Sequence, residues 1–181
     1  EIQASDWSSD VCSSDLGDAG DLGALVNLSL SSKKWFIEKD EFDVAERQLL
    51  NFGHSFGHAL EAACGFRIQH GVGVAIGMLA AICHPSSEQT NATKSLERYI
   101  IQLLSPLSSE IVDLRSILDW EIFESSLASD KKNTVSHLCL ILPGEGGGLE
   151  KKFLPYSEDA VQIAREALQE ALGLLTKTGD K

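Results

Sequence analysis

The side chains best suited to chemistry lie between residues 47 and 70. Four of them recur at the spacing of one helix face: Arg47, Asn51, His54 and His58. A guanidinium group can hold a carboxylate or a phosphate through two parallel hydrogen bonds. An imidazole can bind a divalent metal ion or move a proton near neutral pH. We therefore predict a polar stripe that binds an anionic ligand and a metal, with a solvated helix face as the alternative.

A third histidine, His70, follows sixteen residues after His54 and opens a small, apolar segment. Two imidazoles from different elements and one carboxylate make a plausible open metal site. Spacing alone leaves open which two imidazoles bind the metal, and the i, i+4 pair of His54 and His58 is the simplest choice. Gly53 and Gly57 each lower helix stability by roughly 1 kcal/mol relative to alanine. Their position beside the histidines predicts that something approaches this backbone closely.

The elements that position these residues are predicted to be mostly helical. Apolar residues at helical spacing predict helices over residues 22–39, 46–64, 71–83, 94–104, 108–118 and 120–127, with a last helix that Ser157 caps. Residues 137–142 and 151–154 predict the strands of a small β-hairpin near the C-terminus. The glycine-rich stretch Gly144–Gly148 between them is interpreted as the hairpin turn. A phosphate loop is the alternative, but it requires a helix directly after it.

Length and composition exclude several classes of protein. The 181 residues correspond to about one domain. A net charge of −12, from 15 basic and 27 acidic residues, argues against nucleic-acid binding. No apolar run reaches the roughly 20 residues of a membrane span, so no membrane partner is expected. Four scattered cysteines without a CxxC pair indicate reduced thiols in a cytoplasmic protein: Cys12, Cys64, Cys83 and Cys139.

Residues 1–16 differ from the rest of the chain. They are rich in serine and aspartate and show neither helical nor strand periodicity. They lack the basic start and apolar run of a signal peptide. Residues 6–16 look like one translated reading frame of a sequencing-library adapter. We therefore interpret residues 1–16 as a non-native segment and residues 17–181 as a helical metal- and substrate-binding domain, with a natural disordered tail as the alternative for residues 1–16.

The sequence R-x-L-L-N-F-G-H-S-F-G-H-A-L-E from Arg47, followed by H-G-x-x-V-A-I-G-M from His70, resembles 3-dehydroquinate synthase and its sugar-phosphate cyclase relatives. The resemblance runs without a gap over residues 33–78 and extends more weakly to residues 130–132. It implies the helical C-terminal domain of a two-domain enzyme. The N-terminal α/β nucleotide-binding domain of that enzyme is expected to be absent from this chain.

The resemblance also implies roles for single residues. His54 and His70 correspond to ligands of a zinc or cobalt ion, and the third ligand, a glutamate, is expected upstream of this sequence. His58 corresponds to the proton-transfer histidine. Asp43 takes the place of an acidic glutamate a few residues before the arginine, with a side chain one methylene shorter. The residues that correspond to contacts with the substrate carboxylate, hydroxyl and phosphate are Lys33, Arg47, Asn51, Lys131 and Lys132.

The implied reaction converts a seven-carbon sugar acid phosphate to a carbocycle with loss of phosphate. It belongs to the shikimate pathway of aromatic amino acid biosynthesis. NAD would carry the hydride and would bind mainly through the absent domain, while the metal polarises the reacting hydroxyl. The expected partner is this small substrate, and the resemblance is compatible with a homodimer. The chain by itself is expected to be inactive.

One departure from the family pattern leaves the substrate open. The family's H-G-E-A-V is H-G-V-G-V here, over residues 70–74, which removes a charge beside the metal site. A cyclase of secondary metabolism or of a polysaccharide pathway is therefore an alternative. An iron-dependent alcohol dehydrogenase shares the architecture but lacks the N-F-G-H-x-x-G-H pattern. From a different class, the alternative is a non-catalytic, metal-binding helical module.

Overall fold

The computed structural model of the chain describes residues 22–42, 45–130, 133–134 and 136–177. The chain divides into two units, residues 1–50 and residues 51–181. In the first unit, α1 (Leu22–Lys39) forms over the predicted range. The 3-10 helix η3 (Glu46–Asn51) follows it, and its last residue begins the second unit.

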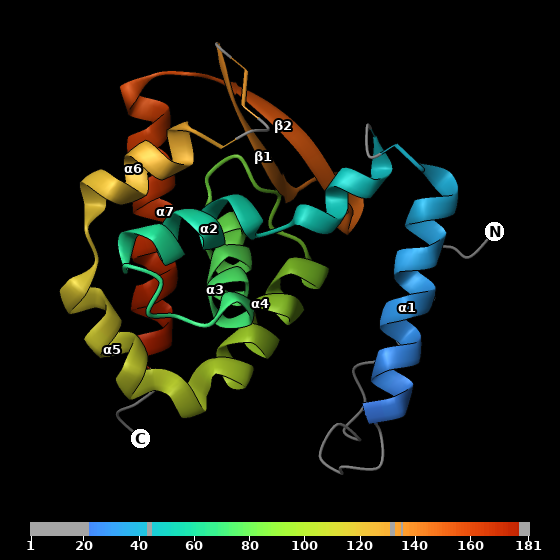
Figure 1. Cartoon of the computed structure of the whole chain (residues 1–181), viewed down its shortest axis with the longest axis horizontal. Coiled ribbons are helices and arrows are strands. Elements are labelled where there is room, and N and C mark those ends of the chain that lie inside the picture. Colours follow the sequence, from blue (N-terminus) through green and yellow to red (C-terminus); the bar gives the residue numbers. More distant parts are fainter. Residues whose placement is uncertain (1–21, 43–44, 131–132, 135, 178–181) are drawn as a thin grey trace. The chain divides into compact units, whose positions relative to one another are not determined.

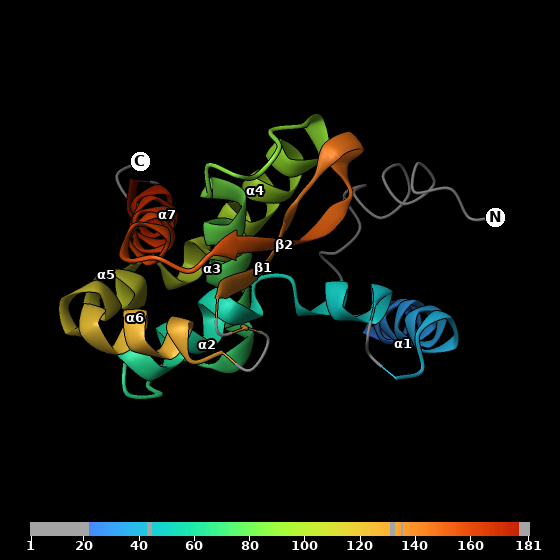
Figure 2. The same cartoon turned by 90° about the horizontal axis from the view of Figure 1, so that it is seen from above.

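The second unit is helical and carries one β-hairpin (Figure 1). Its elements are, in chain order, α2 (His54–Ala63), α3 (His70–Cys83), α4 (Asn91–Leu104), η4 (Ser105–Leu107), α5 (Ser108–Ile117), α6 (Trp120–Ala128), β1 (His137–Pro143), η5 (Glu145–Gly147), β2 (Leu149–Pro155) and α7 (Glu158–Lys177). The helix α3 packs against α2, α4, α7 and β1, and it lies between α7 and α4 in both views (Figures 1 and 2). The prediction of a mostly helical fold with a hairpin near the C-terminus is confirmed.

The helix α3 forms the centre of this unit because nearly every face of it is apolar. Ile76, Leu79 and Ile82 have no exposed surface. A helix that is apolar all round must be covered on all sides, and the four elements packed against it provide that cover. None of the described helices combines the length and the hydropathy needed to cross a membrane.

Glycines allow α2 and α3 to pack backbone against backbone. A Cβ atom on Gly77 would overlap the carbonyl oxygen of Gly53 and would lie 2.7 Å from the amide nitrogen of Gly57. A Cβ atom on Gly57 would lie 3.0 Å from the carbonyl carbon of Gly73. Real Cβ atoms have almost no contacts as short as those at Gly77, and the contact at Gly57 is tighter than nine in ten of theirs. The close approach predicted from Gly53 and Gly57 is therefore confirmed, and α3 is the element that makes it.

The predicted continuous helix over residues 46–64 is wrong. Residues 46–51 form the 3-10 helix η3, and α2 begins only at His54. Gly53, between them, has a φ of 78°, a left-handed conformation that favours glycine. A Cβ atom on Gly53 would lie 2.6 Å from the amide nitrogen of Met78. The helix is therefore interrupted at the point where only a glycine fits beside α3.

The hairpin has the predicted location and turn. Its strands pair antiparallel with His137 opposite Pro155. β1 is buried almost throughout, whereas exposed residues alternate with partly buried residues along β2. The turn contains two glycines with positive φ, Gly146 at 71° and Gly147 at 85°. Because a strand follows this turn, the phosphate-loop alternative is excluded.

The histidine directly after α3 is buried and held neutral. His84 is 2% exposed, and its Nδ1 accepts a hydrogen bond from the backbone N–H of Ser86 at 3.1 Å. Its Nε2 is buried and has no hydrogen-bond partner among the described residues. Burial, together with the charge of Lys152, lowers the pKa of His84 to about 4. Lys152 also donates to the carbonyl oxygen of Ser86 at 2.7 Å, so it ties β2 to the segment after α3.

Replacing Gly77 with alanine is expected to destabilise the fold by about 2–3 kcal/mol, because the added Cβ must displace the backbone of α2. Gly71→Ala is the matched control in the same helix, where an added Cβ meets nothing within 4 Å. That variant is expected to gain up to about 1 kcal/mol from helix propensity. Urea unfolding followed by circular dichroism measures both changes. Equal stabilities for the two variants would contradict the close contact between α2 and α3.

The fold is expected to lose stability as pH falls from about 6.5 to about 4. The pKa of His84 is near 6.5 in the unfolded chain and about 4 in the folded one, so the unfolded state binds more protons in this window. This difference corresponds to a loss of up to about 3 kcal/mol. His84→Asn keeps an acceptor for Ser86 but does not titrate. Its urea midpoint should therefore fall less than that of the wild type between about pH 7 and about pH 4, and an equal fall would refute this account.

Candidate functional site

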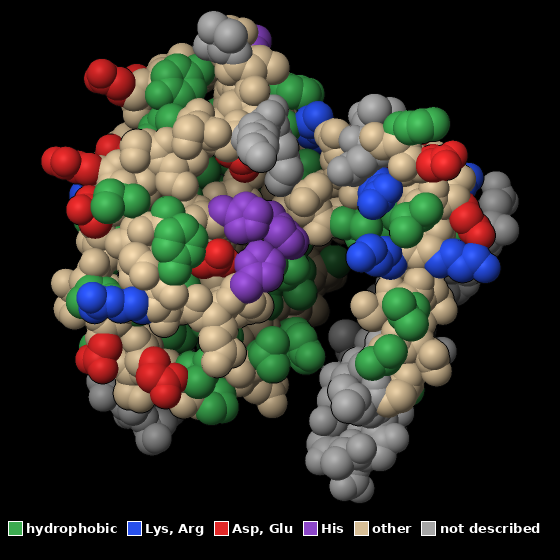
Figure 3. Space-filling model, viewed as in Figure 1, with side chains coloured by type: hydrophobic (Ala, Val, Ile, Leu, Met, Phe, Trp, Pro, Cys, Tyr) green, Lys and Arg blue, Asp and Glu red, His purple; other side chains and the backbone are tan. Residues whose placement is uncertain are grey.

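Three histidines from two helices gather on the surface of the second unit. The centroids of their imidazole rings are 5.5 Å apart for His54 and His58 and 5.6 Å apart for His54 and His70. The remaining pair, His58 and His70, is separated by 5.5 Å. Histidine side chains form a patch near the centre of the face shown in Figure 3. His54 is half-buried, whereas His58 and His70 are exposed. The structure thus brings together the three histidines that the sequence predicted.

The glycine contact between α2 and α3 explains why His70 reaches the other two. The two helices run antiparallel, since Gly53 lies against Gly77 and Gly57 lies against Gly73. Each histidine of α2 directly follows one of these contact glycines. The first residue of α3 is His70, which is therefore carried to the same surface.

The ring separations suit a metal ion that binds two imidazoles. Two imidazoles on one tetrahedral zinc, each at about 2.0–2.1 Å, have centroids about 5 Å apart. Both His54–His70 and His54–His58 meet this distance, so distance alone does not choose between them. The rings of His58 and His70 are stacked, with their planes 23° apart, so their in-plane lone pairs do not converge on one ion. Within the part of the chain that the structure describes, no set of three histidine, cysteine or carboxylate side chains forms a metal site.

Hydrogen bonds distinguish His58 from the other two histidines. Nδ1 of His70 lies 2.8 Å from Oε1 of Glu61, and Nδ1 of His54 lies 3.3 Å from the carbonyl oxygen of Phe52. Both acceptors favour a proton on Nδ1, which leaves the lone pair on Nε2, an arrangement common in metal-binding histidines. Neither ring nitrogen of His58 has a hydrogen-bond partner among the described residues. Among the described residues, His54 and His70 are therefore suited to bind a metal through Nε2, whereas no hydrogen bond orients the ring of His58.

The predicted substrate-binding residues do not share the helix of the histidines. Lys33 is exposed on α1, and Arg47 is half-buried in η3, both in the first unit. Asn51 ends η3 and belongs to the second unit. The prediction that Arg47 and Asn51 lie on one helix face with His54 and His58 is wrong, because the turn at Gly53 separates η3 from α2. The predicted site residues Asp43, Lys131 and Lys132 lie outside the described residues.

Sequence reasoning missed a buried carboxylate that shapes the segment of Arg47. Asp40, interpreted as part of an acidic linker, is 6% exposed. Its Oδ2 accepts hydrogen bonds from the backbone N–H groups of Ala45 at 2.7 Å and Arg47 at 3.1 Å. The Nη1 of Arg47 donates to the carbonyl oxygen of Glu41 at 3.1 Å. Asp40 therefore holds the backbone that carries the arginine, and no periodic pattern in the sequence signals this contact.

Glu61, the carboxylate on His70, was also missed. Its signal was present in the sequence, because Glu61 follows His54 and His58 at i+7 and i+3 and so shares their helix face. Its side chain is 12% exposed. A carboxylate on this face next to two imidazoles could have been read as part of the same cluster.

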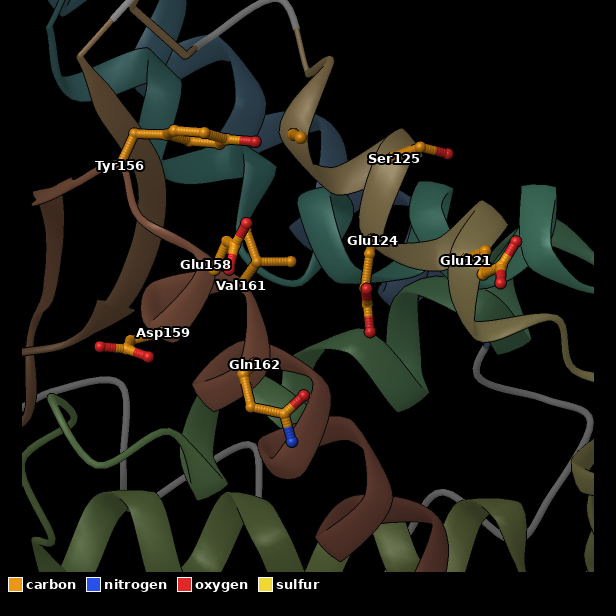
Figure 4. Close-up of a pocket in the computed structure, with 9 residues that line it drawn as sticks. Glu121, Glu124, Ser125, Tyr156, Glu158, Asp159, Val161 and Gln162 are labelled. Atoms are coloured by element: carbon orange, nitrogen blue, oxygen red, sulfur yellow. The ribbon is translucent and has the colours of Figure 1, made fainter.

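A separate hollow of about 580 Å³ lies between α6 and the start of α7 (Figure 4). Its lining includes four carboxylates: Glu121, Glu124, Glu158 and Asp159. Like charges repel, so this lining disfavours a phosphorylated or carboxylated ligand. None of the predicted site residues that the structure describes lines it. The candidate site is therefore the histidine cluster.

Comparison with known proteins agrees with the resemblance found in the sequence. The sequence profile of the 3-dehydroquinate synthase C-terminal family matches residues 6–133. The chain belongs to this family. The match begins inside residues 1–16, which lie outside the described residues, so their interpretation as a non-native segment stays a prediction.

Curated relatives in this family carry the name 3-dehydroquinate synthase. The protein of that name from Streptococcus pyogenes serotype M6 is 35% identical over 134 residues, which cover 70% of this chain and 35% of the relative. The one from Dictyoglomus turgidum is 37% identical over 143 residues, or 78% of this chain and 39% of the relative. The chain thus spans between a third and two-fifths of the length of these relatives.

Replacing Asp40 with alanine is expected to loosen the backbone that carries Arg47. Loss of a capping carboxylate costs about 1 kcal/mol, which corresponds to about fivefold to tenfold faster hydrogen exchange at the amides of Ala45 and Arg47. Hydrogen exchange followed by nuclear magnetic resonance measures both amides. Glu41→Ala is the control, because only the backbone carbonyl of Glu41 contacts the arginine. The same exchange rates in both variants would show that Asp40 does not hold this segment.

Proposed function

We propose that the chain is the metal- and substrate-binding part of a 3-dehydroquinate synthase-like enzyme. The proposed reaction is the cyclisation of a seven-carbon sugar acid phosphate with release of phosphate, a step of aromatic amino acid biosynthesis. The observation that carries the proposal is the meeting of His54, His58 and His70 at ring separations of 5.5–5.6 Å, in a chain of this family. The names of the curated relatives support the same assignment.

His54 and His70 are proposed to hold a zinc or cobalt ion through Nε2. Their Nδ1 atoms face the carbonyl oxygen of Phe52 and the carboxylate of Glu61, which orients each ring for this purpose. When bound, the ion acts as a Lewis acid that polarises the reacting hydroxyl of the substrate. The third ligand is proposed to be a glutamate upstream of this sequence, since an open catalytic site usually has three protein ligands.

His58 is proposed to transfer the proton. It is exposed, and its ring lies 5.5 Å from the rings of both proposed ligands. Its nitrogens have no acceptor or donor among the described residues, so either could face a substrate. An imidazole suits this role because it can both take and give a proton near neutral pH.

Positive and polar side chains are proposed to bind the rest of the substrate. Lys33 and Arg47 suit its phosphate and carboxylate, and Asn51 suits a hydroxyl. Arg47 is already positioned by its contacts with Asp40 and Glu41. The predicted roles of residues 43, 131 and 132 remain part of this proposal.

NAD is proposed as the hydride carrier of the whole enzyme. The described residues of this chain do not fit a dinucleotide site, because their glycine-rich stretch is the turn of a hairpin rather than a loop between a strand and a helix. The nucleotide is therefore proposed to bind mainly outside this chain. The chain by itself is expected to show no turnover.

The described cysteines with shifted pKa values take no part in the proposed chemistry. Burial raises the pKa of Cys64 to about 11, and burial with the charges of Glu170 and Glu97 raises the pKa of Cys83 to about 12. Both are free thiols and stay protonated near neutral pH, so they are poor nucleophiles. Free thiols suit a reducing compartment, and we place the proposed enzyme in the cytoplasm.

A related cyclase that acts on a different sugar phosphate is the second candidate. Val72 and Gly73 stand where the family pattern has glutamate and alanine, directly after the proposed ligand His70. Val72 is only partly exposed, so an apolar side chain replaces a charge next to the site. This change favours a substrate with a less polar group at that position.

The proposed function predicts that a chimera releases phosphate. In it, residues 17–181 replace the matching part of the Dictyoglomus turgidum relative. The folded chimera is expected to release phosphate from a seven-carbon sugar acid phosphate in the presence of NAD and zinc or cobalt, whereas this chain alone is not. A panel of other seven-carbon sugar phosphates tests the second candidate. A folded, metal-binding chimera that releases phosphate from no member of the panel would favour a non-catalytic metal-binding module.

His54 and His58 are expected to differ in role although they share a helix face. In the chimera, His54→Ala should lose bound metal. His58→Ala should keep the metal and lose about 10²- to 10⁴-fold in turnover, the range typical of proton-transfer groups. Metal content is measured by atomic absorption and turnover by phosphate release. Equal loss of metal in both variants would instead identify the i, i+4 pair as the chelate.

A further inference from the structure

The carboxylate of Glu61 connects the end of α2 to the first residue of α3. Its Oε1 lies 2.8 Å from Nδ1 of His70. The glutamate side chain is 12% exposed and the histidine side chain is 59% exposed. The contact is therefore well shielded on the side of the carboxylate and open on the side of the imidazole.

Backbone hydrogen bonds fix the position from which Glu61 acts. The N–H of Phe66 donates to the carbonyl oxygen of Glu61 at 2.7 Å, and the N–H of Gly65 donates to the carbonyl oxygen of Ala62 at 3.0 Å. These two bonds form the common closing motif of a helix that ends in a left-handed residue, and Gly65 has a φ of 60°. The last turn of α2, which carries Glu61, is thus closed just before the loop to α3.

Gly73 provides the space that this carboxylate occupies. A Cβ atom on Gly73 would lie 2.9 Å from Oε1 and 3.2 Å from Cγ of Glu61. A side chain at this position would require the flexible end of Glu61 to shift. The sequence differs from the family's H-G-E-A-V at this residue, where glycine replaces alanine, and at Val72, where glutamate is replaced.

We propose that Glu61 is the positioning residue of His70. The carboxylate keeps the proton of the neutral imidazole on Nδ1, so that Nε2 carries the lone pair beside His54 and His58. This role of Glu61 rests on the proposed function, because orienting His70 matters only if His70 binds the metal. The contact itself can be tested without metal or substrate.

The tautomer of His70 provides that test. In the ¹⁵N-labelled chain above the pKa of histidine, long-range ¹H–¹⁵N spectra are expected to show the His70 proton on Nδ1. Glu61→Ala should move it to Nε2, the nitrogen that carries it in most solvated histidines, whereas Glu61→Gln should retain it on Nδ1 through the amide oxygen. Glu61→Gln is therefore the matched control for Glu61→Ala.

Zinc titration of the same variants measures the consequence for the metal. Loss of a carboxylate behind a ligating histidine typically weakens metal binding about 10- to 100-fold, and Glu61→Ala is expected to show this loss. An Nδ1 proton that is unaffected by Glu61→Ala would overturn the proposal. A tautomer that changes while zinc affinity stays constant would support the role of Glu61 and would instead contradict His70 as a metal ligand.

Discussion

Two helices can come into backbone contact only where neither has a side chain between them, and the second unit depends on this constraint. The glycines of α2 and α3 meet at two levels, Gly53 with Gly77 and Gly57 with Gly73. Because α3 is apolar on nearly all faces, other elements pack around it, and α2 is the one that packs in backbone contact with it. The left-handed turn at Gly53 follows from the same constraint, since no larger residue fits beside α3 there.

The close contact places three chemically identical side chains together, and their surroundings then make them different. Two of the rings each face an oxygen atom. His54 faces the backbone carbonyl of Phe52, just before α2, and His70 faces the carboxylate of Glu61, near the end of α2. The third ring has no such partner among the described residues. A hydrogen-bond acceptor behind an imidazole decides which nitrogen can bind a ligand. The roles proposed for these histidines therefore depend on the neighbouring residues and not on the residue type.

Much of the fold could be predicted from the sequence, because side-chain periodicity reports which face of an element is buried. This holds for α1, for α3 and for the hairpin with its glycine turn. Periodicity failed at Gly53, because a glycine fits both a helix and the turn that ends one, and only the position of α3 decides between them. It also failed at Asp40, whose carboxylate binds backbone amides that every residue has. The histidine cluster was predicted from residue types and the family motif, whereas the ring hydrogen bonds that distinguish its members depend on tertiary structure.

The acidic hollow between α6 and α7 bears on how a ligand arrives. Of its four carboxylates, Glu124 is paired with Arg165 at 2.8 Å, and the others add to a net charge of −12. The acidic surface of this part of the protein therefore repels an anionic ligand, which is attracted only close to cationic residues. Dissolved salt shortens the reach of the repulsion, to about 8 Å at physiological ionic strength. Such a ligand would encounter the protein faster as ionic strength rises, the reverse of the salt dependence seen when a protein's field guides its substrate inward.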